Sequence, residues 1–214
     1  IGPRFPKSDR IEILCINFRF SKSTASAMPA ATASPPSADR AIAEPTDFLG
    51  LNVYMRSIVA DDPGTLPWRC KGIPAPKDAP RTDMGWEIHP PVARLILEDH
   101  HRRYGNLPGR KPLDFYIAEN GAAFPGEDRV GTDGRIHDQA RIDYLREHFR
   151  EAHRVLEKGV RFKGYFVWSL MDNFEWAEGF TKRFGIVHVD YGTQKRTPKD
   201  SFRWYQDVVR TGKV

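Results

Sequence analysis

The chain has 214 residues, of which 40% are hydrophobic and 29% charged, and this is the composition of a soluble globular protein. Its net charge of +5 and its pI of about 9.2 would suit nucleic-acid binding if the basic residues were clustered. They are mixed with acids instead, as in residues 146–151, so we expect solvated helix faces and no nucleic-acid partner.

Three further kinds of protein are disfavoured. No apolar run approaches the ~18 residues that a membrane helix needs, and residues 1–20 lack the apolar region of a secretory signal. Cys15 and Cys70 fit neither a disulfide framework nor a zinc knuckle, which favours a reducing, cytoplasmic location. His100 and His101 are adjacent on a predicted helix and point in different directions, so we expect no metal site, and no cofactor is implied.

The chain divides near residue 45. Residues 1–45 receive no function: they hold one candidate isolated strand at 11–18, followed by a segment rich in Ala, Ser, Pro and Thr over 21–45. That segment contains too few apolar groups to offset the entropy of ordering it. Residues 46–214, in contrast, alternate apolar runs with amphipathic segments and form the predicted folded part.

The pattern after residue 46 predicts strands that alternate with helices. The predicted strands cover residues 47–54, 113–118 and 164–170, with a short extended segment at 184–190. Three helices are predicted. The first opens with Pro90-Pro91 and ends before Gly105, the second follows Asp138 as its N-cap and ends before Gly159, and the third covers about 199–209. The proline- and glycine-rich stretch 60–85 is predicted to be one long loop.

This order of elements is that of parallel βα units, in which the loops after the strands carry the chemistry. Periodicity alone leaves a barrel and a doubly wound open sheet as alternatives. Glu119 ends the second strand, and Gly121 after it permits an unusual backbone path. By itself this glutamate is more readily interpreted as a loop cap or as the partner of an arginine.

Residues 168–180 contain two Trp, two Phe and three acids within thirteen positions. Sugar binding needs this mixture, because carboxylates accept hydrogen bonds from vicinal hydroxyls while aromatic faces cover the C–H side of the ring. A purely structural interpretation would need partners for acids that stand beside buried aromatics.

Four stretches, in order, resemble glycoside hydrolase family 1, the β-glucosidase family, over about residues 46–211. Residues 48–54 resemble the segment on the sixth barrel strand, and 116–121 the nucleophile motif that ends the seventh, with Ala118 where the family usually has Thr. Residues 168–180 resemble the sugar-binding segment after the eighth strand, and 183–191 the terminal signature. The resemblance implies an α/β fold: a partial (β/α)8 TIM barrel that corresponds to the last three βα units.

The resemblance also implies a retaining β-glycosidase that hydrolyses O-glycosyl bonds of a small glycoside or oligosaccharide. Glu119 resembles the nucleophile and Tyr54 the tyrosine that hydrogen-bonds to its carboxylate. The residues that resemble the sugar-binding set are Asn52 beside the nucleophile, Trp168 as the platform under the ring, Glu175 and Trp176 at the distal hydroxyls, and Phe184 as a pocket wall.

The second carboxylate of a retaining glycosidase, the acid/base, lies in an Asn-Glu-Pro motif in this family, and that triplet does not occur here. Glu44-Pro45 follows an alanine and is interpreted as a coincidence. A whole barrel needs ~250 residues. We therefore expect a truncated product, a fragment whose partner is a complementary N-terminal half, or a chain in which residues 1–45 replace the missing strands. The composition of 21–45 favours truncation. The alternative function is a non-catalytic carbohydrate-binding remnant.

Overall fold

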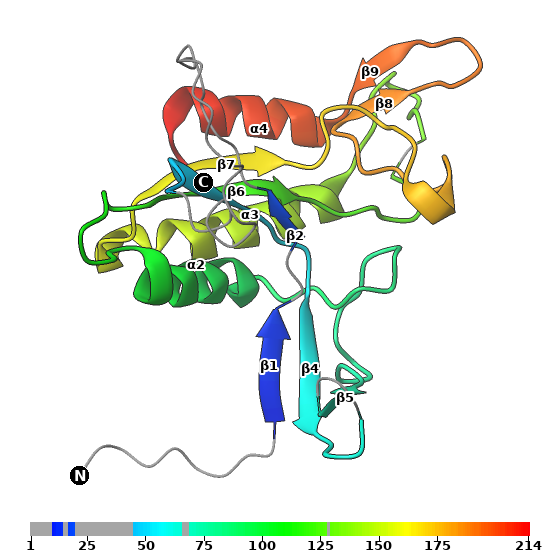
Figure 1. The fold of residues 1–214 in the computed structure, drawn as a ribbon. Coiled ribbons are helices and arrows are strands. Elements are labelled where there is room, and N and C mark those ends of the chain that lie inside the picture. The colour runs from blue at the N-terminus through cyan, green and yellow to red at the C-terminus, as the bar shows by residue number, and fades with distance from the viewer. Residues whose placement is uncertain (1–9, 15–16, 20–44, 66–68, 128) are drawn as a thin grey trace, which may run out of the picture.

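A four-stranded sheet organises the computed structural model, which describes residues 10–14, 17–19, 45–65, 69–127 and 129–214 (Figure 1). Its strands, in spatial order, are β2 (Asn17–Arg19), β3 (Phe48–Asn52), β6 (Asp114–Asn120) and β7 (Phe162–Val167). Strands β3, β6 and β7 are parallel, whereas β2 is antiparallel to β3. The three parallel strands are those that the sequence predicts, shifted by a few residues at their ends.

Three helices follow the parallel strands in turn. Helix α2 (Pro91–Tyr104) lies between β3 and β6 in the sequence, α3 (Gln139–His153) between β6 and β7, and α4 (Asp200–Thr211) follows β7. Helix α2 packs against α3, and α3 against α4. The described part of the chain is therefore a run of three βα units with an open sheet, as the partial-barrel prediction requires.

Alternation along the strands divides the sheet into two faces. Phe115 and Ile117 of β6 are fully buried in a core that also contains Leu51 of β3 and Ile96 and Leu97 of α2. Leu95 of the same helix is only half-buried, whereas Leu97 has no exposed surface.

Aromatic rings cross the opposite face of the sheet. The ring centroids of Phe48 and Tyr116 are 5.1 Å apart, and those of Tyr116 and Phe166 are 6.5 Å apart. Gly164 makes room for this row, because a Cβ there would lie 2.9 Å from the Tyr116 ring. Phe166 is more than half exposed at the β7 end of the row.

A second, antiparallel sheet extends from the body of the fold (Figure 1). It consists of β1 (Arg10–Leu14), β4 (Arg56–Asp61) and β5 (Cys70–Ile73). The predicted long loop over 60–85 is therefore wrong in its first part, because Pro63 and Gly64 lie between two paired strands, where such residues also mark a turn. The predicted isolated strand at 11–18 is instead two paired strands, and most of 21–45 lies outside the described residues.

The N-cap predicted for α3 also differs. Asp138 precedes the helix but makes no side-chain cap; its carboxylate is buried and accepts hydrogen bonds from Arg141 Nε at 2.9 Å and Ser201 N at 2.8 Å. A buried guanidinium competes better for this carboxylate than a helix N–H does. The helix ends at His153, and Gly159 (φ 74°) follows a short 3-10 turn, η1 (Leu156–Lys158).

Candidate functional site

The register between β3 and β6 places two of the predicted site residues side by side. Asn52 is paired with Glu119 across the parallel ladder, and Val53 N donates to Glu119 O at 2.8 Å. Tyr54 follows directly, and its hydroxyl donates to Glu119 Oε2 at 2.8 Å. The predicted contact between Tyr54 and Glu119 is therefore present in the structure, at the carboxyl ends of two neighbouring strands.

The end of β7 approaches the same point. Trp168 N donates to Asn120 O at 2.8 Å, and the following Trp168–Ser169 peptide bond is cis. Gly121 allows this approach, because a Cβ there would lie 1.7 Å from Trp168 O. A side chain at position 121 is thus incompatible with the packing of the two strand ends.

An aromatic group surrounds the Tyr54 ring. Trp86 lies 5.5 Å and Phe184 6.4 Å from it between ring centroids, and the Trp86 and Phe184 rings are 6.1 Å apart. Phe184 is almost fully buried, and its carbonyl accepts hydrogen bonds from Ser169 N and Arg141 Nη1, both at 3.2 Å. Trp86 was missed by the sequence reasoning: it follows the predicted long loop, and its only signal was an aromatic residue after a glycine.

The segment that carries Phe184 is held in place by Asp172. This carboxylate has no exposed side-chain surface and accepts hydrogen bonds from Gly185 N at 3.0 Å and Val189 N at 3.3 Å. Arg183 Nη1 at 2.9 Å and Lys199 Nζ at 3.1 Å complete its environment. One of the three acids in the sugar-binding-like segment is therefore a structural anchor, with the partners that a buried acid requires.

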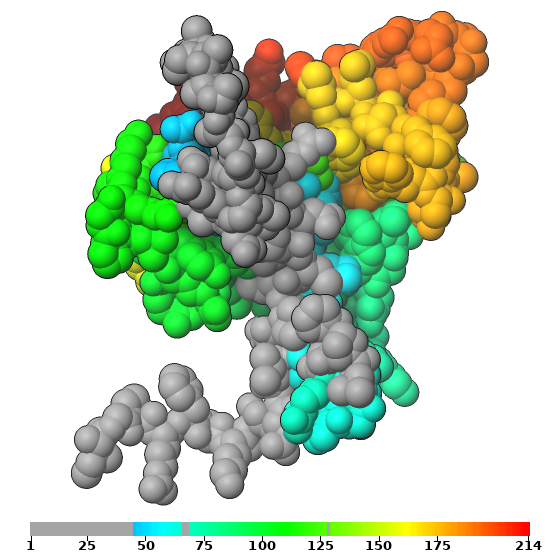
Figure 2. All heavy atoms as spheres, in the orientation of Figure 1, coloured from blue at the N-terminus to red at the C-terminus, as the bar shows by residue number. Residues whose placement is uncertain are grey.

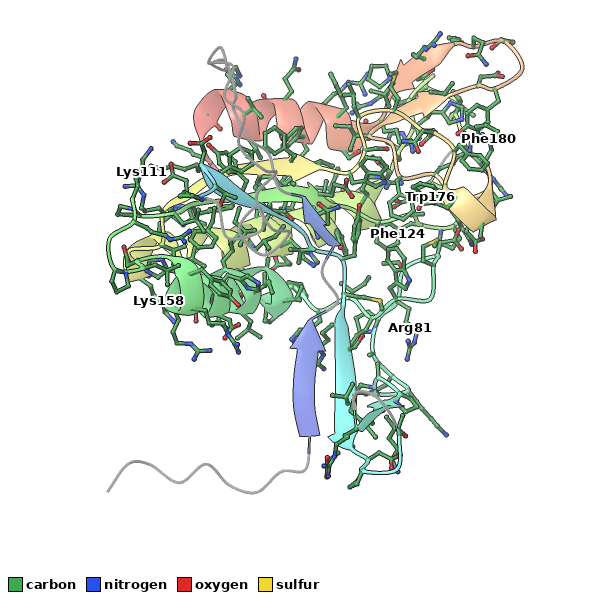
Figure 3. The ribbon with its side chains drawn as sticks, in the orientation of Figure 1. Arg81, Lys111, Phe124, Lys158, Trp176 and Phe180 are labelled. Atoms are coloured by element: carbon green, nitrogen blue, oxygen red, sulfur yellow. The ribbon has the colours of Figure 1, made fainter. Side chains whose placement is uncertain are left out.

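Glu175 and Trp176 lie where the loop after β7 enters the turn η2 (Trp176–Glu178). Burial raises the pKa of the Glu175 carboxyl and the charge of Glu119 raises it further, while a side-chain hydrogen bond with Trp168 lowers it. Glu175 therefore contacts Trp168 and lies within electrostatic range of Glu119. Trp176 is 80% exposed, and Figure 3 shows it with Phe124 and Phe180 at the opposite end of the fold from Lys111 and Lys158.

The electrostatics of the site favour a stable hydrogen bond to Glu119. Burial, followed by the charge of Glu119 and the bond to it, raises the pKa of Tyr54 well above its usual value of 10. The phenol therefore stays protonated and remains a donor to the carboxylate. Asn52 Oδ1 is buried and has no hydrogen-bond partner among the described residues, so the residue paired with Glu119 has an unsatisfied acceptor.

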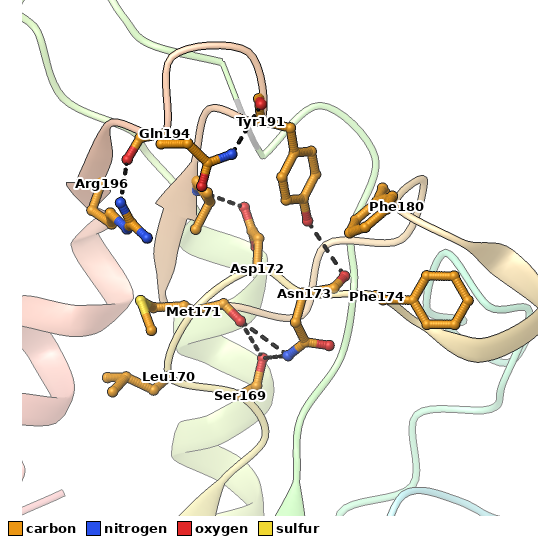
Figure 4. A pocket seen from close by; sticks show the side chains of 11 residues that line it. Ser169, Leu170, Met171, Asp172, Asn173, Phe174, Phe180, Tyr191, Gln194 and Arg196 are labelled. Atoms are coloured by element: carbon orange, nitrogen blue, oxygen red, sulfur yellow. Dashed lines mark hydrogen bonds between the residues drawn. The ribbon is translucent and has the colours of Figure 1, made fainter.

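A separate hollow of about 710 Å³ lies between the loop after β7 and the hairpin of β8 (Val187–Val189) and β9 (Arg196–Pro198) (Figure 4). Its lining includes Leu170, Met171, Phe174 and Tyr191 but none of the seven predicted site residues.

Figure 2 shows the loop after β7 next to residues near position 85, and Lys182 Nζ lies 3.0 Å from Asp83 Oδ2 there.

Other kinds of site find no support in the part of the chain that the structure describes. These residues contain no group of three or more His, Cys, Asp or Glu that could hold a metal ion. No helix among them is long and apolar enough to cross a membrane. Cys70 is a free thiol, and Cys15 lies outside the described residues.

Known proteins are similar to this chain in sequence and in fold. β-Glucosidase A of Thermotoga maritima is 51% identical over 169 residues, which are 79% of this chain and 35% of that protein. A 1,4-β-D-glucan glucohydrolase of Thermotoga neapolitana is 49% identical over 169 residues, 79% of this chain and 36% of its own. The T. maritima β-glucosidase solved in complex with deoxynojirimycin matches with a TM-score of 0.72 at 49% identity, over 81% of this chain and 36% of that one.

The chain thus spans about a third of the length of the relatives that it matches. These relatives are β-glucosidase-type glycoside hydrolases, and the solved one has the TIM-barrel fold of which this chain contains a part. The sequence model of the family named Glycosyl hydrolase family 1 matches residues 19–214. That match covers most of the chain, and the chain belongs to glycosyl hydrolase family 1.

Proposed function

We propose that this chain supplies the nucleophile half of a retaining β-glucosidase active site, with Glu119 as the nucleophile. The observation that carries the proposal is the 2.8 Å hydrogen bond from the Tyr54 hydroxyl to Glu119 Oε2. A phenol that stays protonated favours the ionised carboxylate, which is the form that attacks. The 51% identity to a β-glucosidase supports glucosides as the substrate class.

In the proposed reaction a carboxylate oxygen of Glu119 bonds to the anomeric carbon while the bond to the leaving-group oxygen breaks. Water then displaces the carboxylate and releases the free sugar. Asn52 would accept a hydrogen bond from a sugar hydroxyl next to the nucleophile. Trp168 and Phe184 would form the platform and the wall, and Glu175 with the exposed Trp176 would bind the distal hydroxyls.

The leaving group needs a proton from a second carboxylate, and the sequence does not contain the family's acid/base motif. We propose that a complementary N-terminal half supplies it. Within the described residues β7 ends the sheet with one unpaired edge, and the side chain of Phe166 on β7 is more than half exposed. In a barrel this edge pairs with another parallel strand, so this side chain would be covered. The free thiol of Cys70 supports a reducing, cytoplasmic setting.

The test is covalent labelling. The full chain, alone and mixed with the N-terminal part of the T. maritima β-glucosidase, is incubated with 2-deoxy-2-fluoro-β-glucosyl fluoride. Fluoride leaves without protonation, so labelling requires the nucleophile but not the acid. We expect the chain in the mixture to gain one fluoroglucosyl group, which peptide mass spectrometry locates at Glu119.

Matched variants make the labelling specific. Glu119→Gln should abolish it, and Glu157→Gln, which changes an exposed glutamate of the η1 turn, should leave it intact. A label on another carboxylate, or a folded mixture that is never labelled, would overturn the assignment of Glu119.

The second candidate is a carbohydrate-binding remnant without turnover. It is favoured by Trp176, which is 80% exposed and stands next to Glu175 in a sequence that lacks the acid/base motif. Calorimetric binding of deoxynojirimycin to the chain alone, with no labelling at Glu119 in any mixture, would support this function over the first.

A further inference from the structure

Both the nitrogen and the oxygen of the Asn120 side-chain amide, next to the proposed nucleophile, are hydrogen-bonded to other residues of the chain. Asn120 is fully buried, and its Nδ2 donates to Val53 O at 2.6 Å and to the Tyr144 hydroxyl at 3.1 Å. Its Oδ1 accepts from the Tyr165 hydroxyl at 2.5 Å. Phe115 and Ile117 face the helices, and the irregularity of β6 between Ile117 and Asn120 breaks the alternation, so that Asn120 instead of Glu119 contacts α3.

These bonds connect the elements that meet at the site. Val53 lies between the end of β3 and Tyr54, Tyr144 belongs to α3, and Tyr165 belongs to β7. The Tyr144 hydroxyl in turn donates to Tyr54 O at 3.4 Å. Asn120 therefore binds the backbone on one side of Tyr54, and its partner Tyr144 binds the backbone of Tyr54 itself.

We infer that Asn120, Tyr144 and Tyr165 form a positioning clamp that sets the Tyr54 hydroxyl against Glu119; this rests on the proposed function of those two residues. The clamp reaches the carboxylate only through the backbone of Tyr54 and through Asn120 beside Glu119. These hydrogen bonds of its three side chains go to one another and to the backbone of residues 53 and 54, and none goes to the Glu119 carboxylate, so they are positioning residues.

The burial of the clamp explains why it holds one geometry. Burial raises the pKa of both Tyr144 and Tyr165, so both hydroxyls stay neutral and keep a proton to donate. A buried amide that lost one partner would leave an unsatisfied group, which is costly enough to disfavour other arrangements. The Phe149 ring stacks on Tyr165 at 4.0 Å and restricts its rotation.

A role in stability alone would lower the melting temperature without altering the Tyr54 hydroxyl, so the test observes that hydroxyl directly. The chain has seven tyrosines, and 13C labelling at the ring carbon that bears the oxygen gives a small set of NMR signals. Tyr54→Phe assigns the Tyr54 signal. Glu119→Gln, which removes the charged acceptor, gives the signal position of a Tyr54 without its normal bond.

In Tyr144→Phe we expect the Tyr54 signal to move toward its position in Glu119→Gln, and Tyr165→Phe, which cuts the clamp at its other end, should move it in the same direction. The matched control is Tyr191→Phe, since the Tyr191 hydroxyl also donates to a backbone carbonyl, Asn173 O, at 3.3 Å but lies outside the clamp. This variant should leave the Tyr54 signal in place.

The inference is overturned if the signal stays in place in the folded clamp variants, if Tyr191→Phe moves it equally, or if Glu119→Gln does not move it. If Tyr144→Phe does not fold, Tyr165→Phe decides. Because the NMR signal needs no turnover, a moving signal in a chain that is never labelled at Glu119 would sustain the clamp while the proposed function fails.

Discussion

Replacing Asp172 by asparagine tests the buried anchor beneath the site. The substitution keeps the shape of the side chain but removes the charge that faces Lys199, whose side chain is fully buried, and Arg183. Burial already lowers the pKa of Lys199 to about 8. Without Asp172 the amine can release its proton. Because pH 7 lies one unit below a pKa of about 8, the neutral amine in the folded chain is ~1.4 kcal/mol less stable than the native charged amine.

The asparagine amide has a single acceptor oxygen, so the donors at one of the two Asp172 oxygens, either Gly185 N and Lys199 or Arg183 and Val189 N, lose their acceptor. The donors at the other oxygen keep a neutral acceptor, which weakens each bond by ~0.5–1 kcal/mol, whereas a lost bond costs ~1–3 kcal/mol. We therefore expect Asp172→Asn to lower the free energy of unfolding by at least about 3 kcal/mol, the lower end of what breaking a buried ion pair costs. The melting temperature should fall by roughly 6–12 °C.

Urea unfolding at pH 7, followed by circular dichroism, measures this loss. Asp207→Asn is the matched control, because its 3.0 Å pair with Arg210 is largely exposed and should contribute no more than ~0.5 kcal/mol. Adding Lys199→Met to Asp172→Asn should recover part of the loss, since the unpaired amine is gone. An Asp172→Asn chain within about 0.5 kcal/mol of wild type would refute the reasoning, because that is the range of ordinary surface substitutions.

Three further predictions concern single residues. Gly121→Ala would place a Cβ 1.7 Å from the backbone oxygen of Trp168, so the variant should not fold and should show no cooperative transition in a thermal melt. Gly72→Ala, where the Cβ meets nothing within 4 Å, should melt like wild type. Burial lowers the pKa of His148 to about 4, so the unfolded chain binds more protons between pH ~6.5 and 4, and stability is lost as the pH falls through that window. At pH 5 the loss should be about 2 kcal/mol in urea unfolding and absent from His148→Phe. Tyr54→Phe should slow fluoroglucosyl labelling at Glu119 roughly tenfold or more, because a hydrogen bond to a charged group contributes ~1.5–3 kcal/mol; equal rates would contradict that role.

Much of the fold was predictable because burial leaves a periodic pattern. Strands β3, β6 and β7 are short apolar runs, and α2 ends at the glycine that the sequence indicated. The antiparallel hairpin of β4 and β5 was not predictable in the same way, because its sequence is half-exposed and interrupted by the residues that also make loops.

The proposed site could be named from the sequence where its residues belong to a motif, and their roles stay predictions. Glu119, Tyr54 and Glu175 could be named in advance, whereas Trp86 could not, because its contact with the Tyr54 ring depends on the path of a non-periodic segment. Tyr144 is a similar case. On a helix it resembles any other core residue, and only the tertiary structure shows that its hydroxyl contacts Asn120.

The antiparallel pairing of β2 with β3 has a kinetic consequence for the proposed assembly. Strand β2 occupies the edge of β3 up to Asn52, the residue paired with Glu119 on the other side. In a (β/α)8 barrel that edge belongs to a parallel strand, so an incoming half can pair there only after β2 has left. At high concentrations of the N-terminal half, the assembly rate should therefore reach a plateau equal to the rate at which β2 detaches.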